Sequence, residues 1–412
     1  NPCVEIGMFP QYNGKSGWQG CNLTEINGGM CTSEESFLQA CRAAAILGTM
    51  QAGYTDFKFI SDTSKKIFDR EALLGVSITG WMNNPNILFD EKILKKGANI
   101  VKKVNKEVAA IIGINPAART TCVKPSGNAS VLLQTASGIH AEHSPMYIRN
   151  IQMNKESEIT QAIAKSNPFM VEESVWSAGG TDVVVSFPIV PKKGSMFKDD
   201  LYGVKHLELV KKAQKYWVVA GTNEDLCADK GIHHNVSNTI IVDDWDEVEK
   251  YVYKNRYSFS GISFLSPTGD KDYNQAPNTQ VIDAKQMVAK YDQGAIFASG
   301  MVVDALKVYD NLWTACSTAM GMGEDLSVES SENSAKKDWV RRFERFAQNY
   351  LDGDMKKTEY CLKDAYLLHK WEKIQSNLKP VEWENDLTEK VYTDVDTLAA
   401  AACAGGACEI DF

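Results

Sequence analysis

The chain has 412 residues, of which 44% are apolar and 9% aromatic, so it can bury a large core in one big domain and a smaller one. Its formal net charge of −9, without a basic tract, argues against a surface that binds nucleic acid. No apolar run reaches the length of a membrane span and no signal peptide is present, so we expect no membrane partner.

The ten cysteines are scattered and do not form a disulfide scaffold. A reducing cytoplasm is therefore the expected location. Residue 1 is Asn and not Met, which indicates a processed, split or partial chain.

The first predicted element is a helix of about 15 residues, because Thr32-x-x-Glu35 is a capping-box pattern. Alternating and β-branched residues predict short strands further along. These strands lie at Val76–Trp81, Arg119–Lys124 and Thr181–Val190, the last of them ending at Pro188.

A helical face and two more strands follow. Apolar residues at helical spacing predict a helix through Val204, Leu207, Val210, Ala213 and Trp217. Asp243 or Asp244 can cap the next helix, with Trp245, Val248 and Val252 facing inward, between strands at Asn238–Val242 and Gly261–Leu265. Strands that alternate with helices indicate an α/β fold.

The pattern changes near Ser331. Trp339, Phe343, Phe346, Ala347 and Tyr350 form one helical stripe, and a second helix is predicted over Tyr360 to Gln375. Pro380 begins a polar linker. We therefore predict an α/β catalytic portion at 1–330, a helical region at 331–380, and a linker with a redox-active tail at 381–412.

The two ends of the chain hold thiols. Cys3 and Glu5 alternate with Pro2 and Val4, so in an extended segment a sulfur and a proton acceptor face the same side. Cys403 and Cys408 lie in a tail of small residues, as a mobile dithiol requires. Together they suggest a redox enzyme that oxidises its own thiols and is recharged through its tail.

The opening Asn1-Pro2-Cys3-Val4-Glu5 resembles the catalytic finger loop of the ribonucleotide reductase large subunit. Six further stretches resemble that family in order: 20–26, 74–81, 120–130, 235–239, 261–265 and 273–277. The stretch Ser137–Pro145 is most similar to the adenosylcobalamin-dependent branch. The resemblance covers nearly the whole chain.

The resemblance implies roles for the first residues. Cys3 would carry a transient thiyl radical and remove the substrate 3′-hydrogen, and Glu5 would be the general base for the 3′-hydroxyl. Asn1 would hold the ribose hydroxyls. Cys21 would be one of two reducing thiols, with its family partner far upstream. Cys31 and Cys122 are weak substitutes for that partner because neither matches the motif.

The resemblance also implies a fold. We expect the C-terminal half of a ten-stranded α/β barrel, with a finger loop, a helical region and a flexible C-terminal tail. Such a half would need an N-terminal partner half, which would supply the missing thiol.

A substrate-phosphate site is predicted where a strand is followed by Pro125, Ser126, Gly127, Asn128, Ala129 and Ser130. Backbone N–H groups and hydroxyls at a helix start can bind an anion. An ordinary capped turn is the alternative, and a Walker-type loop is absent.

The tail pair Cys403 and Cys408 matches a shuttle that takes electrons from a thioredoxin- or glutaredoxin-like protein. A zinc half-site is the rival, but the spacing is wide and no second ligand pair lies nearby. The pairs His140-x-x-His143 and His233-His234 lack partners at ligand spacing, so we predict hydrogen-bonding roles and no metal site.

Cys3 needs a radical source. The diiron class passes its radical through adjacent tyrosines, and this chain has no Tyr-Tyr pair. The glycyl-radical class does not use such a dithiol tail, so adenosylcobalamin is the expected cofactor. The alternatives are a fragment of a diiron-dependent large subunit and a non-catalytic remnant that binds nucleotide.

Overall fold

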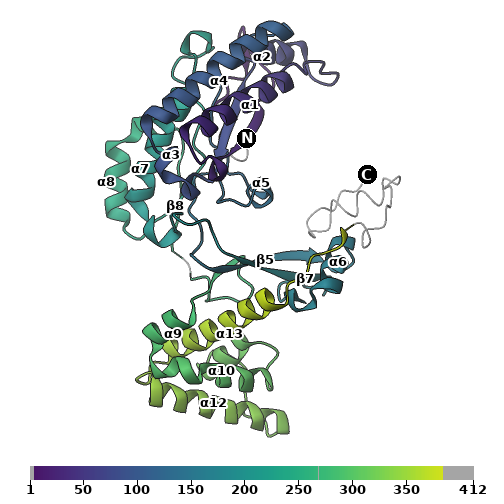
Figure 1. The fold of residues 1–412 in the computed structure, drawn as a ribbon, viewed down its shortest axis with the longest axis vertical. Coiled ribbons are helices and arrows are strands. Elements are labelled where there is room, and N and C mark those ends of the chain that lie inside the picture. Colours follow the sequence, from purple (N-terminus) through teal and green to yellow (C-terminus); the bar gives the residue numbers. More distant parts are fainter. Residues whose placement is uncertain (1–3, 268, 384–412) are drawn as a thin grey trace. The chain divides into compact units, whose positions relative to one another are not determined.

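The computed structural model describes residues 4–267 and 269–383, which fold into two compact units (Figure 1). The first unit contains Asn1–Ser144 and Pro191–Pro267, and the second contains Pro145–Val190 and Thr268–Phe412. In the part of the chain that is described, no helix combines the length and the apolar character needed to cross a membrane.

The first unit alternates strands and helices. Its strands are β1 (Gln11–Tyr12), β2 (Lys15–Ser16), β3 (Asn22–Asn27), β4 (Leu74–Thr79), β8 (Thr239–Ile241) and β9 (Ser263–Leu265). Its α-helices are α1 (Glu34–Ala52), α2 (Asp62–Glu71), α3 (Pro85–Leu88), α4 (Glu91–Ile112), α5 (Asn128–Leu132), α7 (Gly203–Ala213) and α8 (Trp245–Lys254). Short 3₁₀ turns are η1 (Gly28–Met30), η2 (Trp81–Asn83), η4 (Lys198–Asp200), η6 (Glu224–Leu226) and η7 (Arg256–Ser258), and η5 (Gln214–Val219) is a π-helix that continues α7.

Parallel pairing orders the strands of the first unit. β3 pairs with β4 from Asn22↔Leu74 to Asn27↔Thr79, and β8 pairs with β9. Isolated parallel bridges join Val76 to Thr121 and Val123 to Val236. The order of neighbours is therefore β3, β4, 121–123, 236–241 and β9. Within the described residues, neither β3 nor β9 has a strand on its outer edge.

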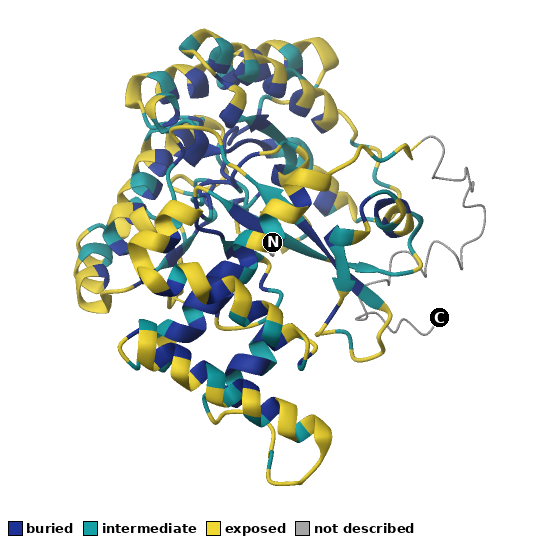
Figure 2. Cartoon of the chain, turned by 60° about the horizontal axis from the view of Figure 1, so that its bottom comes forward, coloured by how far each residue is buried: buried dark blue, intermediate teal, exposed yellow. Residues whose placement is uncertain are grey.

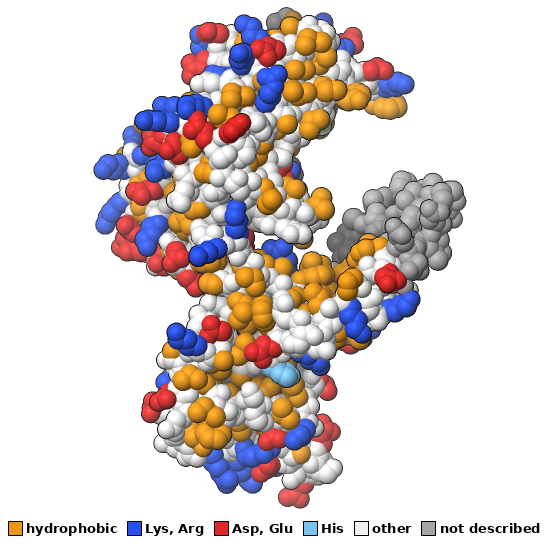
Figure 3. All heavy atoms as spheres, viewed as in Figure 1, with side chains coloured by type: hydrophobic (Ala, Val, Ile, Leu, Met, Phe, Trp, Pro, Cys, Tyr) orange, Lys and Arg blue, Asp and Glu red, His pale blue; other side chains and the backbone are white. Residues whose placement is uncertain are grey.

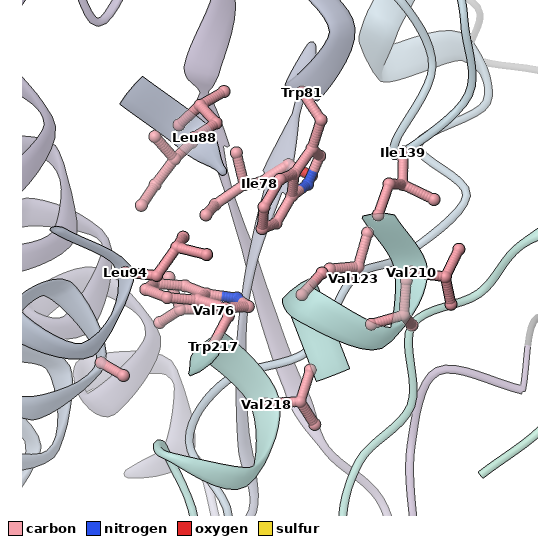
Figure 4. Close-up of a cluster of buried hydrophobic side chains, with 14 of the residues drawn as sticks. Val76, Ile78, Trp81, Leu88, Leu94, Val123, Ile139, Val210, Trp217 and Val218 are labelled. Atoms are coloured by element: carbon pink, nitrogen blue, oxygen red, sulfur yellow. The ribbon is translucent and has the colours of Figure 1, made fainter. Parts of the chain in front are cut away.

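Helices cover one face of this sheet. α1 packs on β3 and on α4, and Gly48 allows a close approach, since a Cβ there would lie 2.3 Å from Leu74 Cδ1. Figure 4 shows the core that results, with Val76 and Ile78 of β4 beside the indoles of Trp81 and Trp217. Trp217 Nε1 donates to Cys122 O at 3.0 Å, so even this buried ring has its polar atom satisfied.

The second unit combines an antiparallel sheet with helices. The sheet has the order β10 (Asn278–Gln280), β5 (Tyr147–Asn154), β7 (Asp182–Ile189) and β6 (Val171–Glu173). Its helices are α6 (Glu158–Ser166), η3 (Pro168–Met170), α9 (Ala284–Tyr291), α10 (Gln293–Leu306), α11 (Leu312–Ala319), α12 (Ser331–Tyr350) and α13 (Met355–Asn377). Trp339, Phe343 and Phe346 of α12 are buried against α10 and α11.

The structure confirms most of the predicted elements and corrects several details. The first helix is capped by Ser33 and Ser36 and not by Thr32 and Glu35, because Ser33 has the extended backbone that a cap requires. Trp245 follows the cap Asp244 but is 51% exposed, so it does not face inward. Segment 119–124 forms bridges rather than a continuous strand.

The strand β7 continues through Pro188, which pairs with Ile148 of β5. β6 pairs only with Val183–Val185, so one edge of β7 is open at Pro188, and a residue without an N–H is tolerated there. The predicted boundary at Ser331 falls inside the second unit, because α9 to α11 pack against α12 and α13.

Burial follows this arrangement. Figure 2 shows buried residues gathered along the strands and exposed residues on the outer faces of the helices. On the face in Figure 3, basic and acidic side chains are interspersed over the helices of the first unit. Such mixing gives no single-sign patch on this face of that unit.

Candidate functional site

The segment Glu5–Gly7 is fixed to the loop that precedes β8. The Asn235 N–H donates to Glu5 O at 2.9 Å, and the Gly7 N–H donates to His234 Nδ1 at 3.1 Å. His234 Nε2 then donates to Leu74 O at 3.1 Å. Burial lowers the pKa of His234 to about 3, so the ring stays neutral and keeps both bonds.

This segment runs very close to its neighbour. A Cβ on Gly7 would lie 2.1 Å from His233 O, so only glycine allows the approach. Val4 has a φ of 56°, a left-handed backbone that is strained for a β-branched residue. Strain of this kind is often found at functional sites.

Glu5 is buried, with 5% of its surface exposed. Its Oε2 has no hydrogen-bond partner among the described residues. A buried carboxylate oxygen without a donor is costly, and a ligand hydroxyl would satisfy it. This environment suits the predicted general base.

The inner face of the sheet, away from α1, gathers side chains around Gly75. Leu23 Cδ2, Cys122 Sγ and Ile6 Cδ1 lie 2.6, 3.0 and 3.2 Å from the position that a Cβ of Gly75 would take. Cys21 lies on the same side of its strand as Leu23, because side chains alternate. It packs into this cluster, which therefore joins the Glu5–Gly7 segment to the predicted reducing thiol.

The environment of Cys21 keeps its thiol protonated. Burial raises the pKa of Cys21 well above its usual range, and the Glu5 carboxylate raises it further, against an opposing effect of Arg119. The charge of Glu5 therefore acts on the Cys21 thiol.

The two substitute partners for Cys21 do not fit. β3 and segment 121–123 lie on opposite sides of β4, so Cys122 is two strand spacings away, about 9.6 Å. A disulfide needs Cα atoms within about 7 Å. Cys31 follows the far end of β3 and is bonded to Asn27 O.

A buried ion pair anchors the elements around this cluster. Arg119 Nη2 donates to Glu71 Oε1 at 2.8 Å, and both side chains are 0% exposed. Arg70 Nη2 and Gln19 Nε2 donate to Glu71 Oε2 at 2.9 and 2.6 Å. Burial raises the pKa of Glu71, but Arg119 and the hydrogen bonds outweigh it, and the net shift is downward.

The same network holds the hairpin that follows the Glu5–Gly7 segment. The Phe9 N–H donates to Gln19 Oε1 at 2.6 Å. Arg70 donates to Phe9 O at 2.9 Å and to Gln11 O at 2.5 Å. Glu71 therefore connects the hairpin, α2 and the segment at Arg119. The sequence analysis missed this network; a lone arginine in the apolar segment 117–123 was the only signal.

The predicted phosphate loop forms a tight turn before α5. Ser126 and Gly127 have φ values of 67° and 47°, and Ser126 Oγ is buried without a hydrogen-bond partner in the described chain. The N–H groups of Gly127, Ala129 and Ser130 already donate to carbonyl oxygens within the loop. The loop thus offers a hydroxyl and fewer free N–H groups than its sequence suggested.

A cavity of about 560 Å³ opens beside Val4 and Ile6, within the size range of small-molecule sites. Its lining includes Lys215, Tyr257 and Phe259. In the sequence, Val4 directly follows Cys3, the predicted radical residue.

The remaining predicted residues lie outside the described ranges: Asn1, Cys3, Cys403 and Cys408.

The histidines have hydrogen-bonding roles. His140 Nε2 accepts from the Thr239 N–H at 3.0 Å, and its Nδ1 lies 3.0 Å from Ser137 O. His233 Nδ1 lies 3.1 Å from Thr222 Oγ1. Residues 4–267 and 269–383 contain no group of three or more His, Cys, Asp or Glu side chains placed to hold a metal ion.

Comparison with known proteins gives sequence relatives of one kind. A probable adenosylcobalamin-dependent ribonucleoside-triphosphate reductase of Dictyostelium discoideum is 25% identical over 293 residues, which cover 69% of this chain and 35% of that protein. An adenosylcobalamin-dependent ribonucleoside-triphosphate reductase of Euglena gracilis is 23% identical over 261 residues, covering 61% and 34%. The chain is similar to part of an adenosylcobalamin-dependent ribonucleotide reductase.

A solved B12-dependent (class II) ribonucleotide reductase shares the fold, with a TM-score of 0.55 and 18% identity over 69% of this chain and 41% of that chain. The chain spans about a third of the length of the curated reductases it matches. No family model matches it. The family resemblance in the sequence is confirmed, and so is the mixed α/β fold.

We predict that Arg119→Leu lowers the free energy of unfolding by about 3–5 kcal/mol, because it leaves the Glu71 carboxylate buried and unpaired. The double variant Arg119→Leu/Glu71→Leu should lose less than the single one. Urea unfolding measures both, with Lys65→Gln as the control, since the Lys65–Asp69 pair is exposed and should change stability by under about 0.5 kcal/mol. An Arg119→Leu loss no larger than that of the control would refute the role of the pair.

We predict that Cys21 reacts slowly with iodoacetamide until the pH is well above 9, because only the thiolate reacts and its pKa is raised. Glu5→Gln should move this rate profile to lower pH, since it removes a negative charge beside the sulfur. The rate is read as mass-labelled Cys21 peptide, with exposed Glu35→Gln as the control. If the rate profile of Glu5→Gln matches that of the wild type, the charge of Glu5 does not act on the Cys21 thiol and the prediction is wrong.

Proposed function

We propose that this chain takes part in the reduction of ribonucleotides to 2′-deoxyribonucleotides by a thiyl-radical mechanism. The observation that supports the proposal most strongly is that the Glu5–Gly7 segment, through Ile6, packs into one cluster with Cys21 on one face of the sheet. There burial raises the pKa of the Cys21 thiol, and the Glu5 carboxylate adds to this effect. The reaction requires a base and a protonated thiol close to one substrate. The sequence similarity to adenosylcobalamin-dependent reductases supports it independently.

The residues would act in order. Cys3 takes the 3′-hydrogen of the ribose, and Glu5 accepts the 3′-hydroxyl proton while the 2′-hydroxyl, protonated by one of the two reducing thiols, leaves as water. Cys21 and a second thiol supply two electrons and two hydrogens and close a disulfide. Cys3 then returns the hydrogen to the 3′-carbon, and Glu5 returns its proton to the 3′-oxygen. Asn1 orients the ribose, and the loop Pro125–Ser130 binds the phosphates, where the buried Ser126 Oγ would find a partner.

The initiating radical would come from adenosylcobalamin when it is bound. The cavity beside Val4 would take part of such a group, because its aromatic rings can stack on an adenine. Tyr257, Phe259 and Lys215 would hold that part. The corrin ring is larger than the cavity and would extend outside it.

The sheet would be completed by strands from an N-terminal half. In the described residues β3 and β9 have open outer edges, and an open edge of a buried parallel sheet is unfavourable. A ten-stranded barrel would close both edges and supply the second thiol, which neither Cys31 nor Cys122 can be. The Cys403–Cys408 pair would then reduce the active-site disulfide and accept electrons from a thioredoxin-like protein.

We predict that Cys3→Ser abolishes deoxyribonucleotide formation and leaves nucleotide binding nearly unchanged, because an O–H bond is stronger than an S–H bond and the hydrogen transfer stops. The assay is anaerobic, uses the complete enzyme, and is run with and without adenosylcobalamin; Cys316→Ala in α11 is the control. Substantial product from Cys3→Ser would refute the mechanism, and product without cobalamin would favour a diiron-dependent enzyme.

We predict that the double variant Cys403→Ser/Cys408→Ser stops multiple turnover driven by a thioredoxin system and spares the first turnover of prereduced enzyme. A small dithiol should restore part of the rate, since Cys21 lines a second cavity of about 600 Å³ through which it could be reached. Thioredoxin-driven rates equal to wild type would rule out the shuttle.

A further inference from the structure

Glu25 and Lys124 form an ion pair on the inner face of the sheet. Glu25 follows Cys21 by four residues on β3, and Lys124 follows Cys122 by two residues, so each continues a row that begins at the thiol cluster. Lys124 Nζ lies 3.4 Å from Glu25 Oε2. Glu25 and Lys124 both act on the pKa of Cys122. Glu5 and Cys21 do so too, so all four groups lie near Cys122.

The pair is incompletely satisfied. The Glu25 side chain is 9% exposed, yet its Oε1 has no hydrogen-bond partner among the described residues. The 3.4 Å separation is longer than the 2.7–2.9 Å typical of a charge-assisted hydrogen bond. A buried ion pair stabilises a fold only when its geometry is good and its other oxygens are bonded. The Lys124 ammonium, whose only hydrogen-bond partner within the described chain is Glu25 Oε2, therefore has donors left for an anionic ligand.

The pair also lies between the two ends of the candidate site. Cys21 and Glu25 are about 13 Å apart along the strand, a distance comparable with that from a ribose to its terminal phosphates. Asn27 Nδ2 donates to Leu133 O at 2.9 Å, so this end of β3 meets the loop after α5. Lys124 directly precedes Pro125. A nucleotide that reaches from Cys21 to the Pro125–Ser130 loop passes Lys124.

We propose that Lys124 binds the phosphate chain of the nucleotide and that Glu25 positions its ammonium group and limits its attraction for anions. The inference rests on the proposed function and names a further residue for phosphate binding. An ammonium group has three donors, so Lys124 can bridge Glu25 Oε2 and a phosphate oxygen at the same time. Because Glu25 cancels part of the charge, the site would favour a ligand with several negative charges.

The test measures the affinity of the complete enzyme for a ribonucleoside triphosphate, the diphosphate and the uncharged nucleoside. Lys124→Gln should weaken triphosphate binding about tenfold or more, diphosphate binding less, and nucleoside binding not at all. Glu25→Gln should keep or raise triphosphate affinity, since it leaves Lys124 with its full charge. Lys124→Arg should retain most of the binding.

Lys103→Gln is the matched control, because it removes the same charge from an exposed position on α4. Equal triphosphate affinity in Lys124→Gln and Lys103→Gln overturns the inference and leaves the proposed function standing. Equal losses in Glu25→Gln and Lys124→Gln, for charged and uncharged ligands alike, show a purely structural pair and also overturn it. A wild-type enzyme that binds none of the three ligands refutes the proposed function itself, and the inference with it.

Discussion

The buried pair of Arg119 and Glu71 is the interaction on which the candidate site depends. Glu71 accepts hydrogen bonds from Arg119, Arg70 and Gln19, and through them joins the hairpin after the Glu5–Gly7 segment to α2 and the sheet. Neither charge is exposed to water, so each is stable only while the other is in place. Arg119 also opposes the rise in the pKa of Cys21, which ties the anchor to the chemistry.

The two faces of the sheet have different roles: one forms the core, and the other forms the candidate site. The face under α1 is apolar and holds the two buried indoles (Figure 4). On the opposite face Ile6, Leu23 and Cys122 surround Gly75, and Glu5, Cys21, Glu25 and Lys124 all act on the pKa of Cys122. Alternation along the strand makes this possible, because neighbouring residues point to opposite sides. One short segment of sequence, 21–27, therefore supplies both the core and the site.

Local features were readable from the sequence, and contacts between distant residues were not. Helical stripes such as Trp339 to Phe346 predicted their elements, since periodicity depends only on nearby residues. The Thr32 cap was wrong by one residue because Ser33 offers the same chemistry beside it. Gln19, Glu71 and Arg119 come from three separate segments, so no local pattern could show that they meet. Cys21 was found through family resemblance alone.

The central claim is that Cys21 is oxidised each time a ribonucleotide is reduced. The direct measurement is the redox state of Cys21, by mass spectrometry, after a single turnover of the prereduced complete enzyme with a ribonucleoside triphosphate and adenosylcobalamin. The account predicts one new disulfide containing Cys21 for each deoxyribonucleotide formed. Deoxyribonucleotide formed while Cys21 remains a free thiol would contradict it.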